Sequence, residues 1–240
     1  MALTGLILVG FILGHAVGNL QVFLGRDVFN TYAHFLQSTG ELLWVVRVVL
    51  LVSIVLHIYT SLKLKALNNA AKPQNYSVKG YIKSTLYSRS MIYSGLAILF
   101  FVVYHLMHFT AHVTNPEYSL FEELYGPQLE AAAVIQTEQG PKRIEAGEGI
   151  FNRHDAYKMV VVGFSKPIVS VVYILAVLFL GMHLSHAVQS MFQTLGFNGP
   201  KLTPNLNLAS KVLGWGIFVA FASVPISILV FGLGKGVIGL

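Results

Sequence analysis

Residues Gly181–Gly196, GMHLSHAVQSMFQTLG, are the stretch that decides the fold. They place His183 and His186 near the end of a long apolar run that begins around Pro167. Ionisable side chains inside a bilayer are costly, so a histidine there indicates a functional role. If His183 is a ligand within a membrane span, other spans must supply its partner.

The composition of the whole chain is that of a membrane protein. Of its 240 residues 55% are hydrophobic and 11% are charged, whereas a soluble domain carries about 25% charged residues. A helix crosses the ~30 Å hydrocarbon core with about 20 residues. We predict one all-α membrane domain with five transmembrane helices. They cover residues 3–24, 41–64, 90–112, 165–195 and 208–232.

Polar segments connect the predicted helices. Residues 26–40 are expected to be a short connection, and residues 113–158 a long outer loop with eight of the ten acidic residues. Ser165 is expected to cap the fourth helix, with Pro167 in the first turn, where its missing N–H costs nothing. Pro225 is expected to kink the fifth helix. The chain contains no cysteine, which excludes disulfides and thiolate-bound clusters within it.

Charge predicts the orientation. The connections at residues 63–89 and 197–207 carry Lys and Arg but no acid, so the positive-inside rule makes them cytoplasmic. The N-terminus is then cytoplasmic and the C-terminus outside, in a multi-pass protein of the cell (inner or plasma) membrane. Residues 1–25 lack the cationic start of a signal peptide and are expected to remain as a helix. The net charge of +6 thus reflects topology and not nucleic-acid binding, while docking of a partner or of anionic lipid at the basic loop stays open.

Histidines recur at matched depths in the first four predicted helices. At 1.5 Å per residue, His15 and His105 lie about 9–10 Å below the outer boundary. His57 and His183 lie about 9 Å from the inner boundary by the same rise. Each level therefore holds one histidine from two different helices, and the levels are expected about 10–12 Å apart in a core of ~30 Å.

Two bis-histidine haems stacked inside a four-helix bundle require this pattern, because ligands in bundles project from facing helices. Two axial imidazoles make the iron six-coordinate, which suits electron transfer. An interhelical hydrogen bond is the alternative for any single histidine. His108 is an alternative iron ligand to His105 on the same helix, and His186 is an alternative to His183. His112 is better placed to bond a propionate or a quinone. Small residues such as Gly14 and Gly181 fit close porphyrin approach and close helix packing equally well.

The sequence around these histidines resembles a known family. The matching segments are GHAVGN at His15, AHFLQS at His34, LHIYTS at His57, VYHLMH at His105 and HLSHAVQSMFQTLG at His183. They resemble the di-haem cytochrome b that forms the membrane-anchor subunit of succinate dehydrogenase and fumarate reductase. The resemblance covers all five spans in order, and the 113–158 connection looks longer than the family pattern.

The resemblance implies an enzyme subunit of succinate:quinone oxidoreductase that binds two haem b groups. By the family pattern His57 and His183 hold the proximal haem, and His15 and His105 the distal haem. A flavoprotein subunit and an iron–sulfur subunit would dock on the cytoplasmic face, where the dicarboxylate chemistry takes place. Electrons would pass through both haems to menaquinone or another membrane quinone, linking the tricarboxylic acid cycle to the respiratory chain.

Quinone chemistry also requires a group that relays protons. Glu41 is the candidate near the outer boundary, with His34, His112 and Asp27 as weaker ones, and each fits a solvated loop residue as well. Arg47 would pair with a distal-haem propionate, or structurally with Glu41 or a carbonyl.

Ser190 and Gln193 lie at the inner boundary, where the proximal propionates would emerge.

Three other classes of protein compete with this interpretation. A stand-alone di-haem cytochrome b without a dicarboxylate-oxidising partner is the alternative, since four ligands alone do not exclude it. The cytochrome b of quinol–cytochrome c reductases fits less well, because its ligands come as two histidines on each of two helices. A metal-ion transporter would want carboxylate ligands, and no Asp or Glu lies in the interior of any predicted span.

Overall fold

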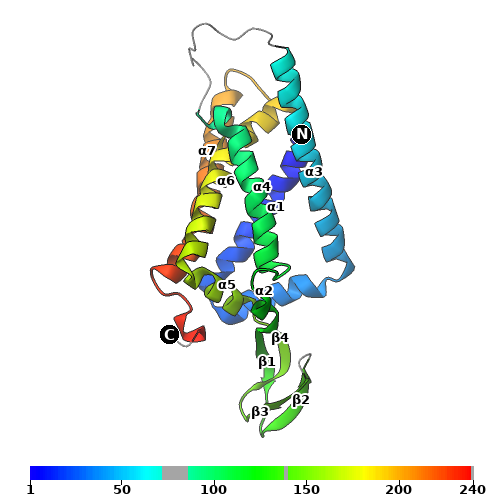
Figure 1. The fold of residues 1–240 in the computed structure, drawn as a ribbon, viewed down its shortest axis with the longest axis vertical. Helices are drawn as coiled ribbons and strands as arrows, with labels where there is room; N and C mark the ends of the chain where they lie inside the picture. The colour runs from blue at the N-terminus through cyan, green and yellow to red at the C-terminus, as the bar shows by residue number, and fades with distance from the viewer. Residues whose placement is uncertain (72–85, 138–139, 239–240) are drawn as a thin grey trace.

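The computed structural model describes residues 1–71, 86–137 and 140–238. Within them five helices are long and apolar enough to cross a membrane, which confirms the predicted all-α membrane fold. They run along the long axis of the molecule and alternate in direction (Figure 1). They are α1 (Ala2–Leu20), α3 (Glu41–Ala70), α4 (Leu86–Phe109), α6 (Pro167–Thr194) and α7 (Leu202–Leu229).

The shorter elements gather at one end of the long helices (Figure 1). They include two α-helices, α2 (Arg26–Ser38) and α5 (Ala156–Ser165), and three 3-10 turns, η1 (Gln21–Leu24), η2 (Pro116–Leu120) and η3 (Lys235–Val237). Strand β1 (Glu122–Gln128) pairs antiparallel with β4 (Gly149–His154), and β2 (Ala133–Thr137) pairs antiparallel with β3 (Gly140–Ile144). The C-terminal end of α3 lies at the opposite end from these strands.

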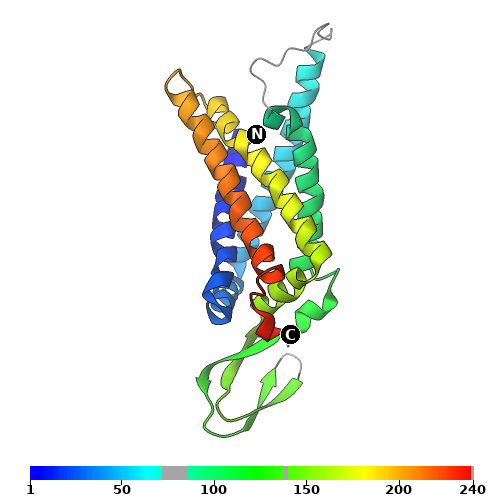
Figure 2. The same cartoon turned by 90° about the vertical axis from the view of Figure 1, so that its left-hand side faces the viewer.

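Helix α6 is the centre of the bundle. It packs against α7 along most of its length, as Figure 2 shows, and also against α4 and α1. A Cβ atom on Gly214 would lie 2.5 Å from the Gly181 carbonyl oxygen, so these two glycines allow α6 and α7 to approach closely. Of the two roles that the sequence left open for Gly181, close porphyrin approach and close helix packing, the structure shows helix packing. Helix α3 packs mainly against α1.

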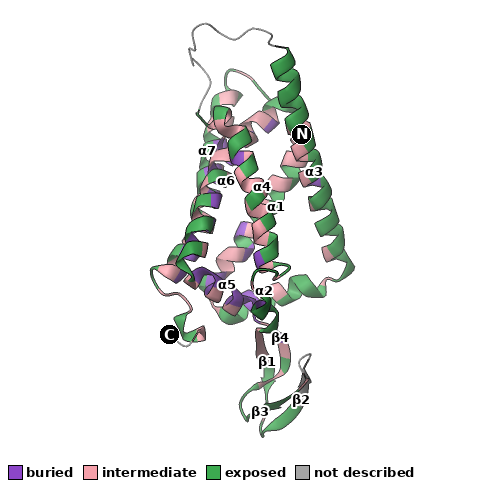
Figure 3. Cartoon of the chain, viewed as in Figure 1, coloured by how far each residue is buried: buried purple, intermediate pink, exposed green. Residues whose placement is uncertain are grey.

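The long helices present apolar side chains outward. Leu51 on α3 and Phe100 on α4 expose 63% and 72% of their surface, and exposed residues cover most of α3 in Figure 3. Continuous exposed apolar surface of this extent indicates an apolar surrounding. A lipid bilayer supplies it, which agrees with the predicted multi-pass membrane protein.

The prediction of a polar connection over residues 26–40 is wrong. Residues 26–38 form helix α2, which turns Phe29 and Asn30 into the interior and leaves Asp27 exposed. Apolar residues recur at helical spacing from Val28 to Leu36, so the amphipathic pattern of a helix is present in this polar segment.

The outer loop predicted over residues 113–158 is also more structured than expected. It holds η2 and the four strands, and α5 begins inside it at Ala156. Ser165 ends α5, where its hydroxyl donates to the Val162 carbonyl, and does not cap the next helix. Helix α6 begins at Pro167 after Lys166. The fourth long helix therefore begins at Pro167 and not at residue 165 as predicted, and the separate helix α5 precedes it.

Other helix bounds shift by a few residues. Helix α3 extends to Ala70 instead of residue 64, and α4 begins at Leu86 and ends at Phe109. Helix α7 begins at Leu202 and continues through Pro225 to Leu229, so part of the predicted 197–207 loop is helical. The middle of the predicted basic loop, including Lys72, Lys79 and Lys83, lies outside the described residues.

Buried polar contacts fasten the strands to α2. Asp155 is fully buried, caps α5 by accepting from Lys158 N at 3.0 Å, and accepts from Asn30 Nδ2 at 2.8 Å and Arg26 Nε at 3.1 Å. Arg153, next to it in sequence, forms ion pairs with Asp27 at 2.7 Å and Glu123 at 2.6 Å. The segment between α4 and α6 is thereby held in place against the end of the bundle.

Candidate cofactor site: two histidine pairs

The rings of His15 on α1 and His105 on α4 are in contact, edge to face. Their centroids are 5.9 Å apart, with the ring planes at 80°. A metal–imidazole bond is about 2 Å long, which puts two imidazoles on opposite sides of one metal about 6 Å apart, centre to centre. The spacing of this outer pair therefore fits two axial ligands of one iron. The juxtaposition predicted from the depths is present, and the ligand role remains a prediction.

His57 on α3 and His183 on α6 are the second predicted pair. They lie close enough to influence each other electrostatically, but the ring contacts of the described residues do not include one between them. Each has a glycine beside it on a neighbouring helix. A Cβ atom on Gly5 would lie 3.8 Å from His57 Cε1, and one on Gly95 would lie 3.6 Å from His183 Cε1. The glycines keep larger side chains away from this inner pair.

The two pairs have the same offset on two helices. On α1, Gly5 faces the inner pair and His15 belongs to the outer one. On α4, Gly95 and His105 stand in the same relation. Ten residues separate the two positions on each helix, or about 15 Å at 1.5 Å per residue. The separation is somewhat larger than the 10–12 Å expected from depth alone.

Three of the four histidines have their Nδ1 atom beside a hydroxyl group of another helix. The contacts are Thr4 Oγ1 to His57 at 3.4 Å, Ser94 Oγ to His183 at 3.1 Å, and Tyr173 Oη to His105 at 3.3 Å. His57 and His183 also interact with the backbone of Met1 and Met91. None of the side-chain contacts among the described residues involves Nε2 of these three histidines. Histidines that bind a metal through one ring nitrogen engage the other in this way, which fixes the ring's orientation.

His15 differs, because the Asn19 amide lies 3.4 Å from its Nδ1 and 3.3 Å from its Nε2. The same amide nitrogen donates to the His15 carbonyl oxygen at 2.8 Å. No group of three or more His, Asp or Glu side chains in the described ranges is arranged to hold a metal ion.

The rival histidines have other surroundings. His108 is fully buried, and its Nδ1 and Nε2 lie 2.9 Å from Tyr173 Oη and 3.3 Å from Tyr118 Oη. Both of its ring nitrogens are therefore occupied. Burial raises the pKa of Tyr118 to about 12, which keeps that phenol neutral. His186 is half-buried and makes no hydrogen bond with the residues described.

His112 lies beyond the end of α4 and not within it. Its φ of 53° is the one positive value of a non-glycine residue in the described chain, a conformation that favours glycine. Its ring stacks on that of His154, with centroids 5.9 Å apart. Burial lowers the pKa of His154, and its Nε2 is buried without a hydrogen-bond partner among the described residues.

The predicted quinone and propionate residues lie at helix ends. Glu41 is the first residue of α3 and is exposed. Arg47 is exposed as well, lies 5.0 Å above the Trp44 ring, and forms no ion pair with any described residue. The structural pair with Glu41 that the sequence allowed is therefore not formed. The described contacts bring neither side chain to the histidine pairs.

At the opposite end of the bundle, Ser190 is half-buried and Gln193 exposed on the last turns of α6. The Ser190 carbonyl accepts from Thr194 Oγ1 at 2.8 Å. Two of the weaker relay candidates, Asp27 and His34, lie on α2 and contact the strands. Asp27 pairs with Arg153, and the His34 ring lies 5.8 Å from that of Tyr125.

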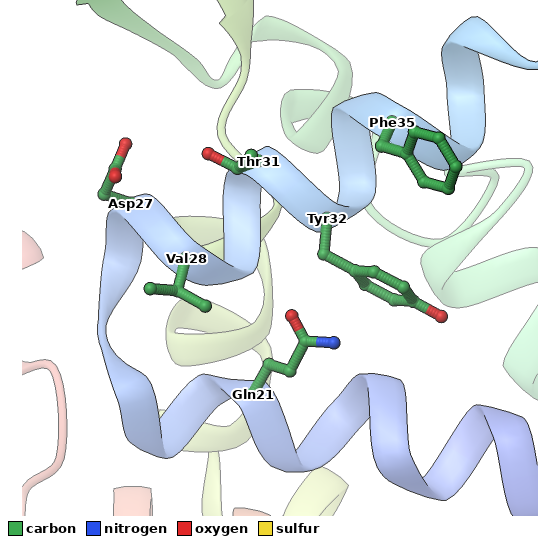
Figure 4. Close-up of a pocket in the computed structure, with 6 residues that line it drawn as sticks. All are labelled: Gln21, Asp27, Val28, Thr31, Tyr32 and Phe35. Atoms are coloured by element: carbon green, nitrogen blue, oxygen red, sulfur yellow. The ribbon is translucent and has the colours of Figure 1, made fainter.

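An open hollow of 480 Å³ lies beside α2 and includes none of the paired histidines. Figure 4 shows Gln21 and Tyr32 between η1 and α2 there. Its lining residues are Gln21, Asp27, Val28, Thr31, Tyr32 and Phe35.

Comparisons of the chain with protein-family models, with curated proteins and with solved structures found no match in any of the three. The resemblance to the succinate dehydrogenase cytochrome b therefore rests on the sequence motifs alone.

The sequence interpretation did not identify the hydroxyl partners of the histidines. One signal was available for Tyr173: it precedes His183 by ten residues on α6, the offset that separates the two levels on α1 and α4. Thr4 and Ser94 have no such signal, because serine and threonine are common within membrane helices.

Proposed function

We propose that this chain is a di-haem cytochrome b that carries electrons across the membrane as the anchor subunit of a succinate:quinone oxidoreductase. One observation carries the proposal. At two levels about 15 Å apart along the helices, three paired histidines engage Nδ1 with a hydroxyl of another helix, and no side-chain contact among the described residues involves their Nε2.

Each pair would hold one haem b. His15 and His105 would supply the ligands at the outer level, and His57 and His183 those at the inner level. Haem b supplies a one-electron ferric–ferrous couple when bound. The chain's own part is to orient the imidazoles through Thr4, Ser94 and Tyr173, and to keep both levels within apolar helices.

The direction and the partners follow from the charge pattern and the resemblance. The basic end of the bundle would face the cytoplasm and receive the flavoprotein and iron–sulfur subunits. The end with α2 and the strands would lie outside, where menaquinone or another quinone would exchange electrons with the outer level. His57 and His183 would then be the entry point for electrons from succinate.

A reduced-minus-oxidised spectrum of the purified protein tests haem binding. We expect a b-type spectrum with two haems per chain. His105→Ala and His183→Ala should each lose one haem, because each removes an axial ligand from a different level. His186→Ala, on the same helix as His183, is the matched control and should keep both. A wild-type chain without haem would refute the proposal.

Co-purification tests the dicarboxylate partner. Isolation from the native membrane should yield a flavin-bearing subunit with the cytochrome, together with succinate-dependent reduction of both haems. A di-haem protein that purifies alone and is not reduced by succinate would instead be the stand-alone cytochrome b.

A further inference from the structure

A chain of alternating histidine and tyrosine side chains leads away from the outer pair. Tyr173 Oη lies 3.3 Å from His105 Nδ1 and 2.9 Å from His108 Nδ1. His108 Nε2 in turn lies 3.3 Å from Tyr118 Oη. Tyr118 and His108 are fully buried, and Tyr173 is 5% exposed. The chain thus joins α4, α6 and the η2 turn where water has little access.

The direction of these hydrogen bonds follows once His105 is a ligand, so this inference rests on the proposed function. A neutral imidazole that binds iron through Nε2 carries its proton on Nδ1. His105 Nδ1–H then donates to Tyr173 Oη. The Tyr173 hydroxyl donates in turn to His108 Nδ1, and His108 Nε2–H donates to Tyr118 Oη. This polarity gives every donor an acceptor except the Tyr118 hydroxyl. The reverse polarity at His108 would make Tyr173 accept two hydrogen bonds and leave the Tyr173 proton without an acceptor among the described residues.

We propose that His108, held by Tyr118, is a positioning residue that aims the Tyr173 hydroxyl away from His105 and thereby lowers the reduction potential of the outer haem. A Tyr173 oxygen whose own proton is engaged by His108 is a better acceptor for His105 Nδ1–H, because successive hydrogen bonds polarise one another. A stronger bond at Nδ1 raises the basicity of the ligating nitrogen. A more basic ligand stabilises ferric over ferrous iron.

Among the described residues, the inner pair has no comparable chain of hydrogen bonds. Ser94 contacts His183 Nδ1 at 3.1 Å, and its hydroxyl otherwise lies 3.1 Å from the Ser90 and Met91 carbonyls of its own helix. The inner haem should therefore not respond to changes at His108 or Tyr118. Each molecule then carries its own internal control.

Redox titration of the two haems, resolved by their spectra, tests the inference. Tyr173→Phe removes the acceptor and should shift the outer ferric–ferrous equilibrium about tenfold toward ferrous, a rise of about 59 mV for one electron. Tyr118→Phe and His108→Leu should shift it in the same direction by less, because Tyr173 remains. In His108→Asn the side-chain carbonyl can still accept from Tyr173, so its outer potential should return toward the wild-type value.

Two controls separate positioning from general damage to the fold. Tyr157→Phe alters a buried tyrosine of α5 outside the chain and should leave both potentials unchanged. Ser94→Ala should move the inner potential alone. If His108→Leu and Tyr118→Phe bind both haems at wild-type potentials, the inference is overturned while the proposed function stands. A wild-type protein without haem overturns both.

Discussion

Replacing Asp155 by alanine should destabilise the end of the bundle that carries the strands. The carboxylate is fully buried and accepts from Asn30 Nδ2, from Lys158 N at the start of α5, and from Arg26. In the part of the chain that the structure describes, the Asn30 donor, which is also fully buried, has no other acceptor.

The contacts give the size of the effect. Loss of the N-cap costs about 1 kcal/mol, and leaving the buried Asn30 donor unsatisfied costs about 1–3 kcal/mol. The Arg26 side chain is 41% exposed and keeps Glu123 at 2.8 Å, so its share is about 1 kcal/mol or less. Asp155→Ala should therefore cost about 2–5 kcal/mol in total. Asp155→Asn should cost less, because its amide oxygen can still cap α5.

Equilibrium unfolding in detergent micelles would measure these differences. Asp27→Ala is the matched control, because that side chain is 85% exposed and its partner Arg153 keeps Glu123. It should cost less than about 1 kcal/mol, as exposed ion pairs do. If Asp155→Ala is no more destabilising than Asp27→Ala, the buried network does not hold the strands to α2, and the reasoning fails.

Three further predictions concern other parts of the molecule. Gly214→Ala should lower stability by about 1–3 kcal/mol through overpacking of α6 against α7, whereas Gly216→Ala, with no atom within 4 Å of the added Cβ, should be tolerated in the same unfolding assay. Because burial lowers the pKa of His154 below its unfolded value of about 6.5, the unfolded chain binds more protons just below that pH. Stability should therefore fall as pH drops from about 6.5 toward the folded pKa, and His154→Gln should flatten this slope. Glu41→Gln should impair quinone turnover and keep both haems, and unchanged quinone-linked activity would exclude Glu41 as the relay.

The sequence was sufficient for the long helices and for the contact between His15 and His105. Apolar run length reports a span directly, because the hydrocarbon core demands about 20 helical residues. Histidine depth follows from a constant rise per residue and from alternation of the spans. For these reasons the meeting of His15 with His105 could be predicted without knowledge of the helix rotations.

The tertiary structure alone decided what surrounds each ring. Contacts such as Tyr173 with His108, or Ser94 with His183, depend on how each helix is rotated about its axis and where its neighbour lies, and neither is encoded in local periodicity. The same holds for Asp155, whose partners Asn30 and Arg26 lie more than a hundred residues earlier in the chain. Helix rise and apolar length are local properties of a sequence, whereas a hydrogen bond between helices is a property of their packing.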